Sequence, residues 1–338
     1  MTAPVWVVVI NWNGSRRTAR CLEFIRRLEY PALRVVVVDN GSTDGSVAEL
    51  RLAFPEVAFR KLGWNRGFAA GANAGIREAR EAGARYVWLV NNDADVEPRA
   101  LSALVDLAES KPEVGAVGSV IVSPSDGQTV EAWGGGWVSC WLGRAAHLKA
   151  PFAARGHRYL VGASLLLRME ALDLLEPLDE GFFLYWEDVD LCVRLRSAGW
   201  CLAVAERSVV RHRAHGSLAA SDPRFDFHYS VSAVRFFARH AALPLVPIVI
   251  GAGARVAARV LRGEWRRACA VLHGTSVGLL SPRPRARPPR DPHALDSGRA
   301  LGYRGGASGG PPARGGERRK REALFCRPSA APRPQLEP

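Results

Sequence analysis

The first 120 residues alternate short apolar runs with amphipathic stretches. The apolar runs are rich in β-branched residues and predict buried strands, and the stretches between them have the periodicity of helices. Continuous apolar strands separated by helices indicate a mainly parallel sheet that is covered on both faces. The predicted strands are VWVVVI, RVVVV, VAFRKL and YVWLV, and the predicted helices lie near residues 16–28, 45–53 and 67–82.

Polar or acidic residues follow three of these strands, in NWNG at 11–14, DNGSTDG at 39–45 and NNDAD at 91–95. Ligands bind to open α/β sheets beyond the carboxyl ends of the strands, so these segments are candidates for a site. Asp93 and Asp95 come two apart after a buried strand, and together they could hold a hard divalent ion. Turn formation and helix capping would explain the acids of the second segment equally well.

The stretch FFLYWEDVDLCVRLRSAGW at 182–200 sets carboxylates directly behind an apolar run. A carboxylate beside apolar bulk loses hydration, so the position is costly unless the acid caps a helix, binds a cation or moves a proton. The apolar spacing after Asp188 predicts a helix, and one interpretation is that Glu187 and Asp188 cap it. Proton transfer in a catalytic site is the other interpretation, and this stretch alone leaves both open.

The motifs disfavour a dinucleotide-binding site and a metal site built from cysteines. A dinucleotide site would need GxGxxG directly after the first strand, and NWNGSRR does not supply it. The later GFAAGANAG spaces its glycines by four, which predicts close packing of a helix. The six cysteines form no CxxC pair, so a metal would take oxygen or histidine ligands.

The charge is concentrated at the C-terminal end of the chain. Of the net charge of +13, residues 281–338 carry +8, and they also contain 11 prolines and 8 glycines. This composition predicts a disordered tail that faces solvent or a membrane. Without interleaved aromatic residues or a nucleic-acid motif, nucleic acid is not an expected partner.

Two segments bear on membrane contact. The apolar run at 5–10 is too short for a membrane span and has no basic leader before it, so we expect a buried strand there. The six cysteines form no tight framework, which fits reduced thiols and a cytoplasmic protein. Between residues 243 and 268 arginines recur at helical spacing and predict a basic amphipathic helix. Such a helix could lie on anionic lipid as a peripheral membrane contact, or pack on the catalytic domain with a solvated arginine face.

Five ordered motifs together resemble glycosyltransferase family 2, in its rhamnosyltransferase-like and galactofuranosyltransferase-like branch. The motifs are VVVINWNG, VVVVDNGSTDGS, NRGFAAGANAG, LVNNDAD and FFLYWEDVDLCVRLRSAG, and the resemblance covers residues 4 to about 217. It implies an α/β fold of the A-type glycosyltransferase class, with a mainly parallel central sheet flanked by helices. It also implies a nucleotide-diphospho-sugar donor, a Mg or Mn ion and inversion at the anomeric carbon.

The resemblance assigns roles to individual residues. Asp188 is the implied general base, with Glu187 beside it, and a positioned carboxylate in that role contributes about 10² to 10⁴ in rate. Metal ligands would be Asp93, Asp95 and His212, with His215 as the alternative to His212. Nucleotide-sugar contacts are implied for Asn11, Asn13, Asp39, Asn65, Gly67 and Asp93, and acceptor contacts for Trp133, Gly162, Ala163 and Trp186.

We therefore expect a catalytic domain at 1–240, whose halves 1–120 and 121–240 bind the nucleotide sugar and the acceptor. The basic helical segment at 241–280 and the tail follow. The expected enzyme works in the cytoplasm or at the inner face of the membrane in cell-envelope polysaccharide synthesis, with a glycan or lipid-linked acceptor. dTDP-rhamnose is the first expected donor, ahead of UDP-linked hexoses or galactofuranose and GDP-mannose.

Two other classes of protein are the alternatives. A sugar nucleotidyltransferase would share the sheet and the metal, but it needs a glycine-rich basic loop after the first strand, which NWNGSRR does not resemble. A non-catalytic basic binding protein on a degenerate transferase domain is the second alternative. The intact acid pairs argue against it.

Overall fold

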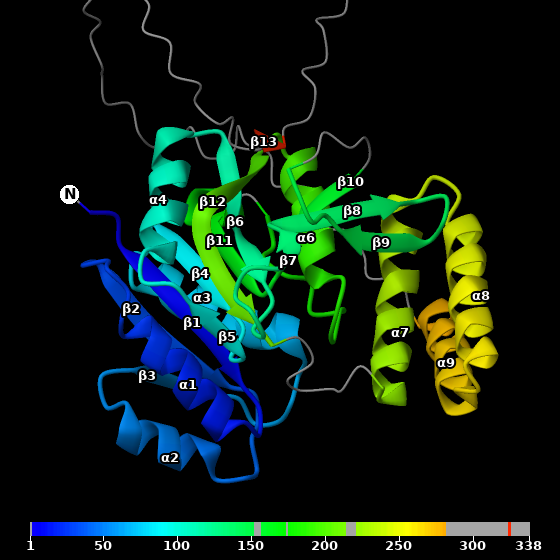
Figure 1. Cartoon of the computed structure of the whole chain (residues 1–338), viewed down its shortest axis with the longest axis horizontal. Coiled ribbons are helices and arrows are strands. Elements are labelled where there is room, and N and C mark those ends of the chain that lie inside the picture. Colours follow the sequence, from blue (N-terminus) through cyan, green and yellow to red (C-terminus); the bar gives the residue numbers. More distant parts are fainter. Residues whose placement is uncertain (1, 152–156, 174, 214–220, 282–323, 326–338) are drawn as a thin grey trace, which may run out of the picture.

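The computed structural model describes residues 2–151, 157–173, 175–213, 221–281 and 324–325, and it confirms the predicted α/β architecture. One large mixed sheet runs through the molecule, and helices cover both of its faces (Figure 1). The strands of this sheet are β1 (Val5–Asn11), β2 (Leu33–Asp39), β3 (Ala58–Lys61), β4 (Tyr86–Val90), β5 (Ala94–Val96), β6 (Val114–Val122), β7 (Val130–Trp133), β11 (Ser164–Arg168), β12 (Cys201–His212) and β13 (Leu324–Phe325).

The half of the sheet built from the first four strands is parallel, as the apolar runs predict. The order across the sheet is β13-β12-β6-β11-β4-β1-β2-β3, while β5 pairs with β12 and β7 with β6. β1 lies between β2 and β4 and is parallel to both, so that Asn11 and Asp39 are opposite each other at the carboxyl ends of β1 and β2. β11 runs antiparallel between β4 and β6, a pairing that the apolar pattern does not reveal.

Helices pack on each face of the sheet. α3 (Phe68–Glu81) and α6 (Glu187–Ser197) cover one face, and α1 (Ser15–Ile25) and α4 (Ala100–Ser110) cover the other. The predicted close packing of α3 is confirmed at one of its glycines, because a Cβ atom on Gly75 would lie 2.3 Å from the side chain of a valine of β1. The short helix α2 (Ser46–Ala53) connects β2 to β3, and α5 (Met169–Asp173) follows β11.

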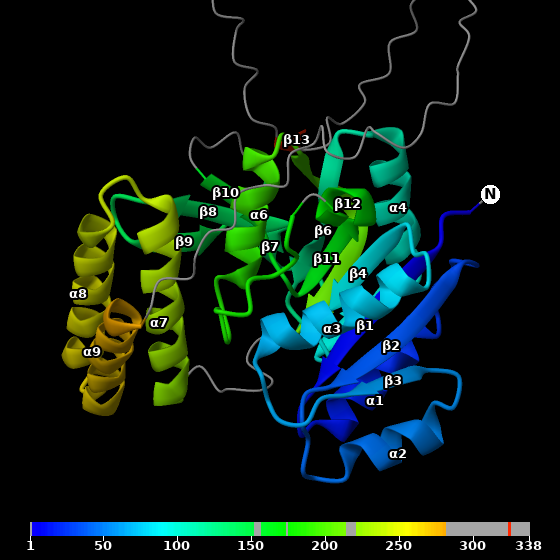
Figure 2. The same ribbon diagram turned by 180° about the vertical axis from the view of Figure 1, so that it is seen from behind.

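A small sheet and a helical bundle lie beside the main sheet. The small sheet is antiparallel, and the first helix of the bundle packs against both of the others. Figures 1 and 2 agree that the second and third helices lie on the side of the first that faces away from the main sheet. These elements are β8 (Gly135–Ser139), β9 (Arg144–His147), β10 (His157–Leu160), α7 (Pro223–His240), α8 (Leu245–Leu261) and α9 (Trp265–Leu280).

The segment predicted as one basic helix is a pair of helices, and two of its arginines point inward. The chain turns at Gly263, which has φ of 70°. Arg255 of α8 lies over the ring of Tyr229 of α7, 5.1 Å from its centroid, and Arg259 donates to Asp226 of α7 at 3.0 Å. The expected alternative of a solvated arginine face therefore does not describe Arg255 and Arg259.

Several expectations fall where the structure says little. His215 and nearly all of the segment 281–338 lie outside the described residues, so the disorder expected there stays a prediction. Residues 324–325 are an exception, because they form β13 and pair with Leu202 and Ala203 of β12. Across the described ranges, no helix has the length and apolar character needed to cross a membrane.

Candidate active site

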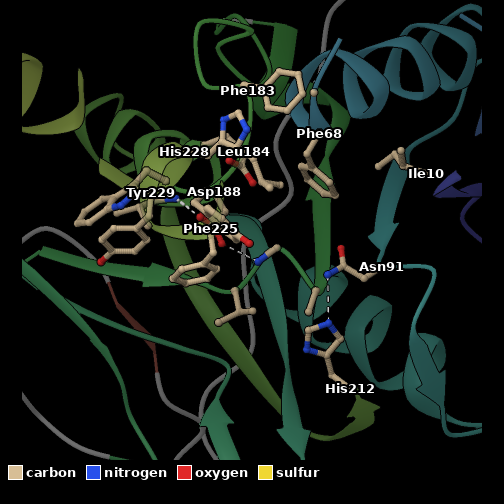
Figure 3. A pocket seen from close by; sticks show the side chains of 18 of the residues that line it. Ile10, Phe68, Asn91, Phe183, Leu184, Asp188, His212, Phe225, His228 and Tyr229 are labelled. Carbon is tan, nitrogen blue, oxygen red and sulfur yellow. Dashed lines mark hydrogen bonds between the residues drawn. The ribbon is translucent and has the colours of Figure 1, made fainter. Parts of the chain in front are cut away.

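A cavity of about 830 Å³ opens beyond the carboxyl ends of β1 and β4 and extends to α7 (Figure 3). Its walls come from segments far apart in the sequence: the strand ends, the loop before α6 and the first turns of α7. Most of the residues predicted for a site meet here. Those that line the cavity are Asn65, Gly67, Asp93, Gly162, Ala163, Trp186, Glu187, Asp188 and His212.

Two consecutive left-handed residues lead into the acid pair. Tyr185 and Trp186 have φ of 68° and 70°, which is uncommon for bulky side chains. α6 begins directly after them at Glu187. Packing holds the conformation in place, because the buried Trp186 ring lies 4.9 Å and 5.2 Å from the ring centroids of Phe236 and Phe237. Backbone strain of this kind concentrates at functional sites.

Asp188 lies on the cavity wall, and its carboxylate accepts two backbone hydrogen bonds. Oδ2 accepts from the N–H of Gly162 and Oδ1 from the N–H of Val189, each at 2.8 Å. Burial raises the pKa of Asp188 above its ordinary value, although the two N–H donors act to lower it. The N-cap of α6 is Trp186, and no side chain caps it, so Asp188 does not act as the helix cap. The bond from Val189 does satisfy a free N–H in the first turn of α6, whereas the bond from Gly162 serves no group of this helix.

Glu187 is the more buried member of the pair, with 6% of its surface exposed. Among the described residues its Oε2 atom has no hydrogen-bond partner. Burial raises the pKa of Glu187 well above its ordinary value, and the charge of Asp188 raises it further. The shift favours the neutral form of Glu187 relative to an exposed glutamic acid, and an acid in that form can donate a hydrogen bond to an oxygen atom in the cavity.

A third acid of the same stretch, Asp190, anchors α6 to α7. It is fully buried and accepts from Arg194 at 2.7 Å and from Arg239 at 2.8 Å, and the ring of His240 also lies at 2.8 Å. Burial alone would raise the pKa of Asp190. The contacts with His240, Arg194 and Arg239 outweigh burial and hold this pKa well below its usual range. Asp190 thus fixes the direction in which α6 presents the acid pair.

Asp93 and His212 form the second polar cluster of the cavity. Their Oδ1 and Nε2 atoms are 3.0 Å apart, and the same imidazole nitrogen lies 3.2 Å from Nδ2 of Asn91. His212 ends β12 and pairs in register with Ala94 of β5, which brings it to the loop that carries Asp93. In the described part of the chain no group of three His, Cys, Asp or Glu side chains is arranged to hold a metal. A carboxylate and an imidazole still make a suitable pair of donors for Mn.

Asp95 does not enter the cavity. It lies in β5, where Arg20 binds its two oxygens at 2.8 Å and 2.7 Å, and Arg213 approaches at 3.5 Å. Its role as a metal ligand stays a prediction, because both carboxylate oxygens accept hydrogen bonds from arginines in this arrangement.

The residues predicted for the nucleotide fall into two groups. Asn65 and Gly67 line the cavity, and the side chain of Asn65 accepts the N–H of Gly67 at 2.9 Å. Asn11 and Asp39 are fully buried behind the wall, where Nδ2 of Asn11 donates to Oδ1 of Asp39 at 3.2 Å. Asn13, also outside the cavity lining, accepts the N–H of Thr43 at 2.9 Å. Asn11, Asp39 and Asn13 thus hydrogen-bond the loops that follow β1 and β2 to each other.

On the predicted acceptor side, Trp133 is the residue that the structure does not bring to the cavity. It ends β7, and its indole Nε1 is buried with no hydrogen-bond partner in the described ranges. Its neighbours Glu131 and Ala132 line the cavity instead. Gly162, Ala163 and Trp186 do line it, close to Asp188.

Comparisons with known proteins identify the family. Residues 6–173 match the model of Glycosyl transferase family 2. The chain is 30% identical over 241 residues to the N-acetylglucosaminyl-diphospho-decaprenol L-rhamnosyltransferase of Mycobacterium tuberculosis (strain ATCC 25618 / H37Rv), which covers 64% of this chain and 78% of that protein. The chain belongs to glycosyltransferase family 2. The resemblance found in the motifs is confirmed, including its rhamnosyltransferase-like branch.

Other similarities of this glycosyltransferase are more distant. It is 28% identical over 222 residues to the O-antigen biosynthesis protein RfbC of Myxococcus xanthus, covering 62% of this chain and 17% of that protein. Among solved structures it is similar to the mannosyltransferase PcManGT from Pyrobaculum calidifontis in complex with GDP-Man and Mn²⁺, with a TM-score of 0.55, 19% identity and coverage of 83% and 88% of the two chains. It is also similar to GalNAc-T7 with UDP, GalNAc and Mn²⁺, with a TM-score of 0.57 and 13% identity, covering 82% of this chain and 56% of that chain. These structures confirm the A-type glycosyltransferase fold.

The glycosyltransferase cavity has a wall that sequence reasoning missed, the first turns of α7. Phe225, His228 and Tyr229 line it, and the His228 ring stacks on Phe183 with centroids 4.8 Å apart (Figure 3). Burial lowers the pKa of His228, and the positive charge of Arg224 adds to this. The signal was present as aromatic residues spaced three and four apart in PRFDFHYS, but that spacing also fits an ordinary core helix.

Proposed function

We propose that this family 2 member moves a sugar from a nucleotide-diphospho-sugar to a hydroxyl of a glycan or lipid-linked acceptor, with inversion of the anomeric carbon, in cell-envelope polysaccharide synthesis. The observation that carries the proposal is that one cavity contains two polar clusters. Asp188, with a raised pKa and two backbone N–H bonds, lies on one wall, and the Asp93–His212 pair lies on another.

In this mechanism Asp188 takes the proton of the acceptor hydroxyl while the acceptor oxygen attacks the anomeric carbon. The bond between these two atoms forms as the bond to the diphosphate oxygen breaks, and the electron pair leaves with the nucleoside diphosphate. A positioned carboxylate contributes about 10² to 10⁴ in rate. Its bond from Gly162 ties the base to the loop between β10 and β11, and Glu187 in its neutral form donates to an acceptor oxygen.

Asp93 and His212 are the residues that would hold a Mg or Mn ion in this cavity. When bound, the ion neutralises negative charge on the leaving diphosphate without a proton transfer. Asn65 and Gly67 contact the nucleotide part of the donor. The buried network of Asn11, Asp39 and their neighbours positions the loops around it.

The donor proposed first is dTDP-rhamnose. Its support is the relative from Mycobacterium tuberculosis, which is named as an L-rhamnosyltransferase acting on an N-acetylglucosaminyl-diphospho-decaprenol. The same name supports a lipid-linked acceptor and, because nucleotide sugars are cytoplasmic metabolites, transfer on the cytoplasmic side. UDP-linked hexoses or galactofuranose and GDP-mannose remain as the other candidates.

Calorimetric titration with a panel of nucleotides and nucleotide sugars, with and without Mn, tests the proposal. We expect the dTDP compounds to bind most tightly and Mn to strengthen the binding. Selective binding of UDP or GDP compounds would change the donor. Absence of any nucleotide binding would favour a non-catalytic binding protein, and release of diphosphate from a nucleoside triphosphate and a sugar phosphate would favour a nucleotidyltransferase.

A further inference from the structure

Helix α8 presents an apolar face to the outside of the molecule. Its sequence, LVPIVIGAGARVAARVL, contains two polar residues, Arg255 and Arg259, and both are directed toward α7. The outward arc is therefore free of charge along the whole helix. Its large exposed side chains are Leu245 (65% exposed), Val249 (66%), Ile250 (45%) and Leu261 (86%).

This surface continues onto two neighbouring segments. The turn between β8 and β9 lies against α8, because a Cβ atom on Gly143 would meet the carbonyl oxygen of Pro247. α9 is the antiparallel neighbour of α8 and also exposes large apolar side chains. The α8–α9 apolar face consists of Leu245, Val249, Ile250 and Leu261 of α8, Trp265, Leu272, Leu279 and Leu280 of α9, and Trp141 and Leu142 of the turn, all at least 45% exposed.

The charges around this face favour an anionic partner. Arg262 and Arg266 are exposed where α8 turns into α9, next to Leu261 and Trp265. Apolar side chains with tryptophan, bordered by arginine, are typical of helices that lie in the interface of a bilayer containing anionic lipid. A second copy of this chain would bring the same positive charges together.

We propose that the α8–α9 apolar face docks on the surface of a membrane that contains anionic lipid. The 17 residues of α8 would lie along the bilayer over about 25 Å. α7 separates this face from the cavity, which its residues Phe225, His228 and Tyr229 line. The α8–α9 layer and α7 both lie between the lipid and the cavity, which is thereby held about two helix diameters, roughly 20 Å, from the membrane. This inference goes beyond the proposed transfer reaction and does not depend on which sugar is moved.

The test is flotation of the full-length protein with vesicles of phosphatidylglycerol and phosphatidylcholine in equal amounts. The triple variant Leu245→Glu, Val249→Glu, Leu272→Glu should lose affinity by about tenfold or more, because three exposed apolar groups become charged. The matched control is Leu52→Glu, on a residue 85% exposed on α2, which should bind like the parent. Arg262→Gln with Arg266→Gln should weaken binding at low salt and have less effect at high salt.

Unchanged vesicle binding in the triple variant would overturn the proposal, since it would mean that charge alone holds the protein on lipid. A parent that is dimeric without lipid, and that the triple variant converts to a monomer, would assign the face to a second copy. Melting temperature and nucleotide binding check that the variant is folded.

Quenching of tryptophan fluorescence by brominated acyl chains gives a second measurement with milder substitutions. The quenching should drop in the double variant Trp141→Phe with Trp265→Phe. It should persist in the control Trp64→Phe, because Trp64 is 69% exposed and lies outside the face. Equal quenching in both variants would also overturn the proposal.

Discussion

The carboxylate of Asp188 and the backbone N–H of Gly162 are joined by a hydrogen bond of 2.8 Å. This bond connects the first turn of α6 to the loop between β10 and β11, two segments that form adjacent parts of the cavity wall. A Cβ atom added on Gly162 would be in ordinary van der Waals contact with Oδ2 of Asp188, at 3.4 Å, so little free space separates the loop from the acid. The proposed base is thus aimed by the same loop that the acceptor is expected to touch.

Asp188→Asn separates the proposed catalytic role from helix capping. The amide retains one acceptor oxygen, so it can keep one of the two backbone bonds, and the loss in stability should be about 0.5–1.5 kcal/mol. It cannot take a proton from a hydroxyl, so turnover should fall by about two to four orders of magnitude. Steady-state kinetics and urea denaturation measure the two effects. Donor binding should persist, and turnover close to that of the parent would return Asp188 to a structural role.

The Asp93–His212 pair predicts a metal-dependent loss of nucleotide binding. In Asp93→Ala the affinity for nucleoside diphosphate should no longer increase on addition of Mn, a loss of at least about tenfold in the presence of the ion. His212→Ala should show the same change more mildly. The control is Asp95→Asn, which weakens the contact with Arg20 but should leave the response to Mn in place. Calorimetry with and without Mn provides the comparison, and an Asp93→Ala variant that still responds to Mn would remove Asp93 from the metal site.

Gly67 joins the nucleotide side of the cavity to the segment that precedes the acid pair. Its φ of 87° is a glycine conformation, and a Cβ atom there would lie 2.3 Å from the carbonyl oxygen of Phe183. That oxygen also accepts the N–H of Phe68 at 2.8 Å. Gly67→Ala should therefore lower the free energy of unfolding by about 2–3 kcal/mol and weaken nucleotide binding.

Gly45 provides a matched control for this prediction. It has φ of 78°, but a Cβ atom there would have no neighbour within 4 Å. Gly45→Ala should lose only the conformational contribution, about 1 kcal/mol. Equal losses for the two variants in urea denaturation would show that the close approach to Phe183 is unimportant.

The sequence predicted the parallel half of the sheet because each of its strands is a continuous apolar run, which can be recognised within a short segment of the chain. The sequence could not predict the environment of Asp95, because in an extended strand its side chain would point to the same side as that of Asp93. The N–H of Ala94 instead donates to the carbonyl of Asn91 at 3.1 Å, so a turn comes between the two acids and their side chains do not point the same way. The α8 arginines illustrate the same limit, since periodicity defines a polar face without fixing whether it turns to solvent or to Asp226 of α7.

Glu187→Gln should change stability in a pH-dependent way. The pKa of Glu187 is raised in the folded protein, so this residue contributes stability that is fully present below the ordinary pKa of a glutamic acid and is lost as the pH rises through the folded value. Glutamine resembles the neutral acid at every pH. The variant should therefore match the parent near pH 4 and exceed it at pH 8, by about 1–3 kcal/mol, the cost of a buried polar group left without a partner.

Asp190→Asn is the control of opposite sign, measured in the same urea denaturations at pH 3, 4, 6 and 8. The pKa of Asp190 is lowered in the folded protein, so its contribution is present above the ordinary pKa of an aspartic acid and is lost as the pH falls through the folded value. Asp190→Asn should be less stable than the parent at pH 8, and the difference should shrink toward pH 3. If Glu187→Gln were instead less stable than the parent at pH 8, Glu187 would be a charged partner in the folded protein, and its proposed role as a neutral hydrogen-bond donor to the acceptor would be wrong.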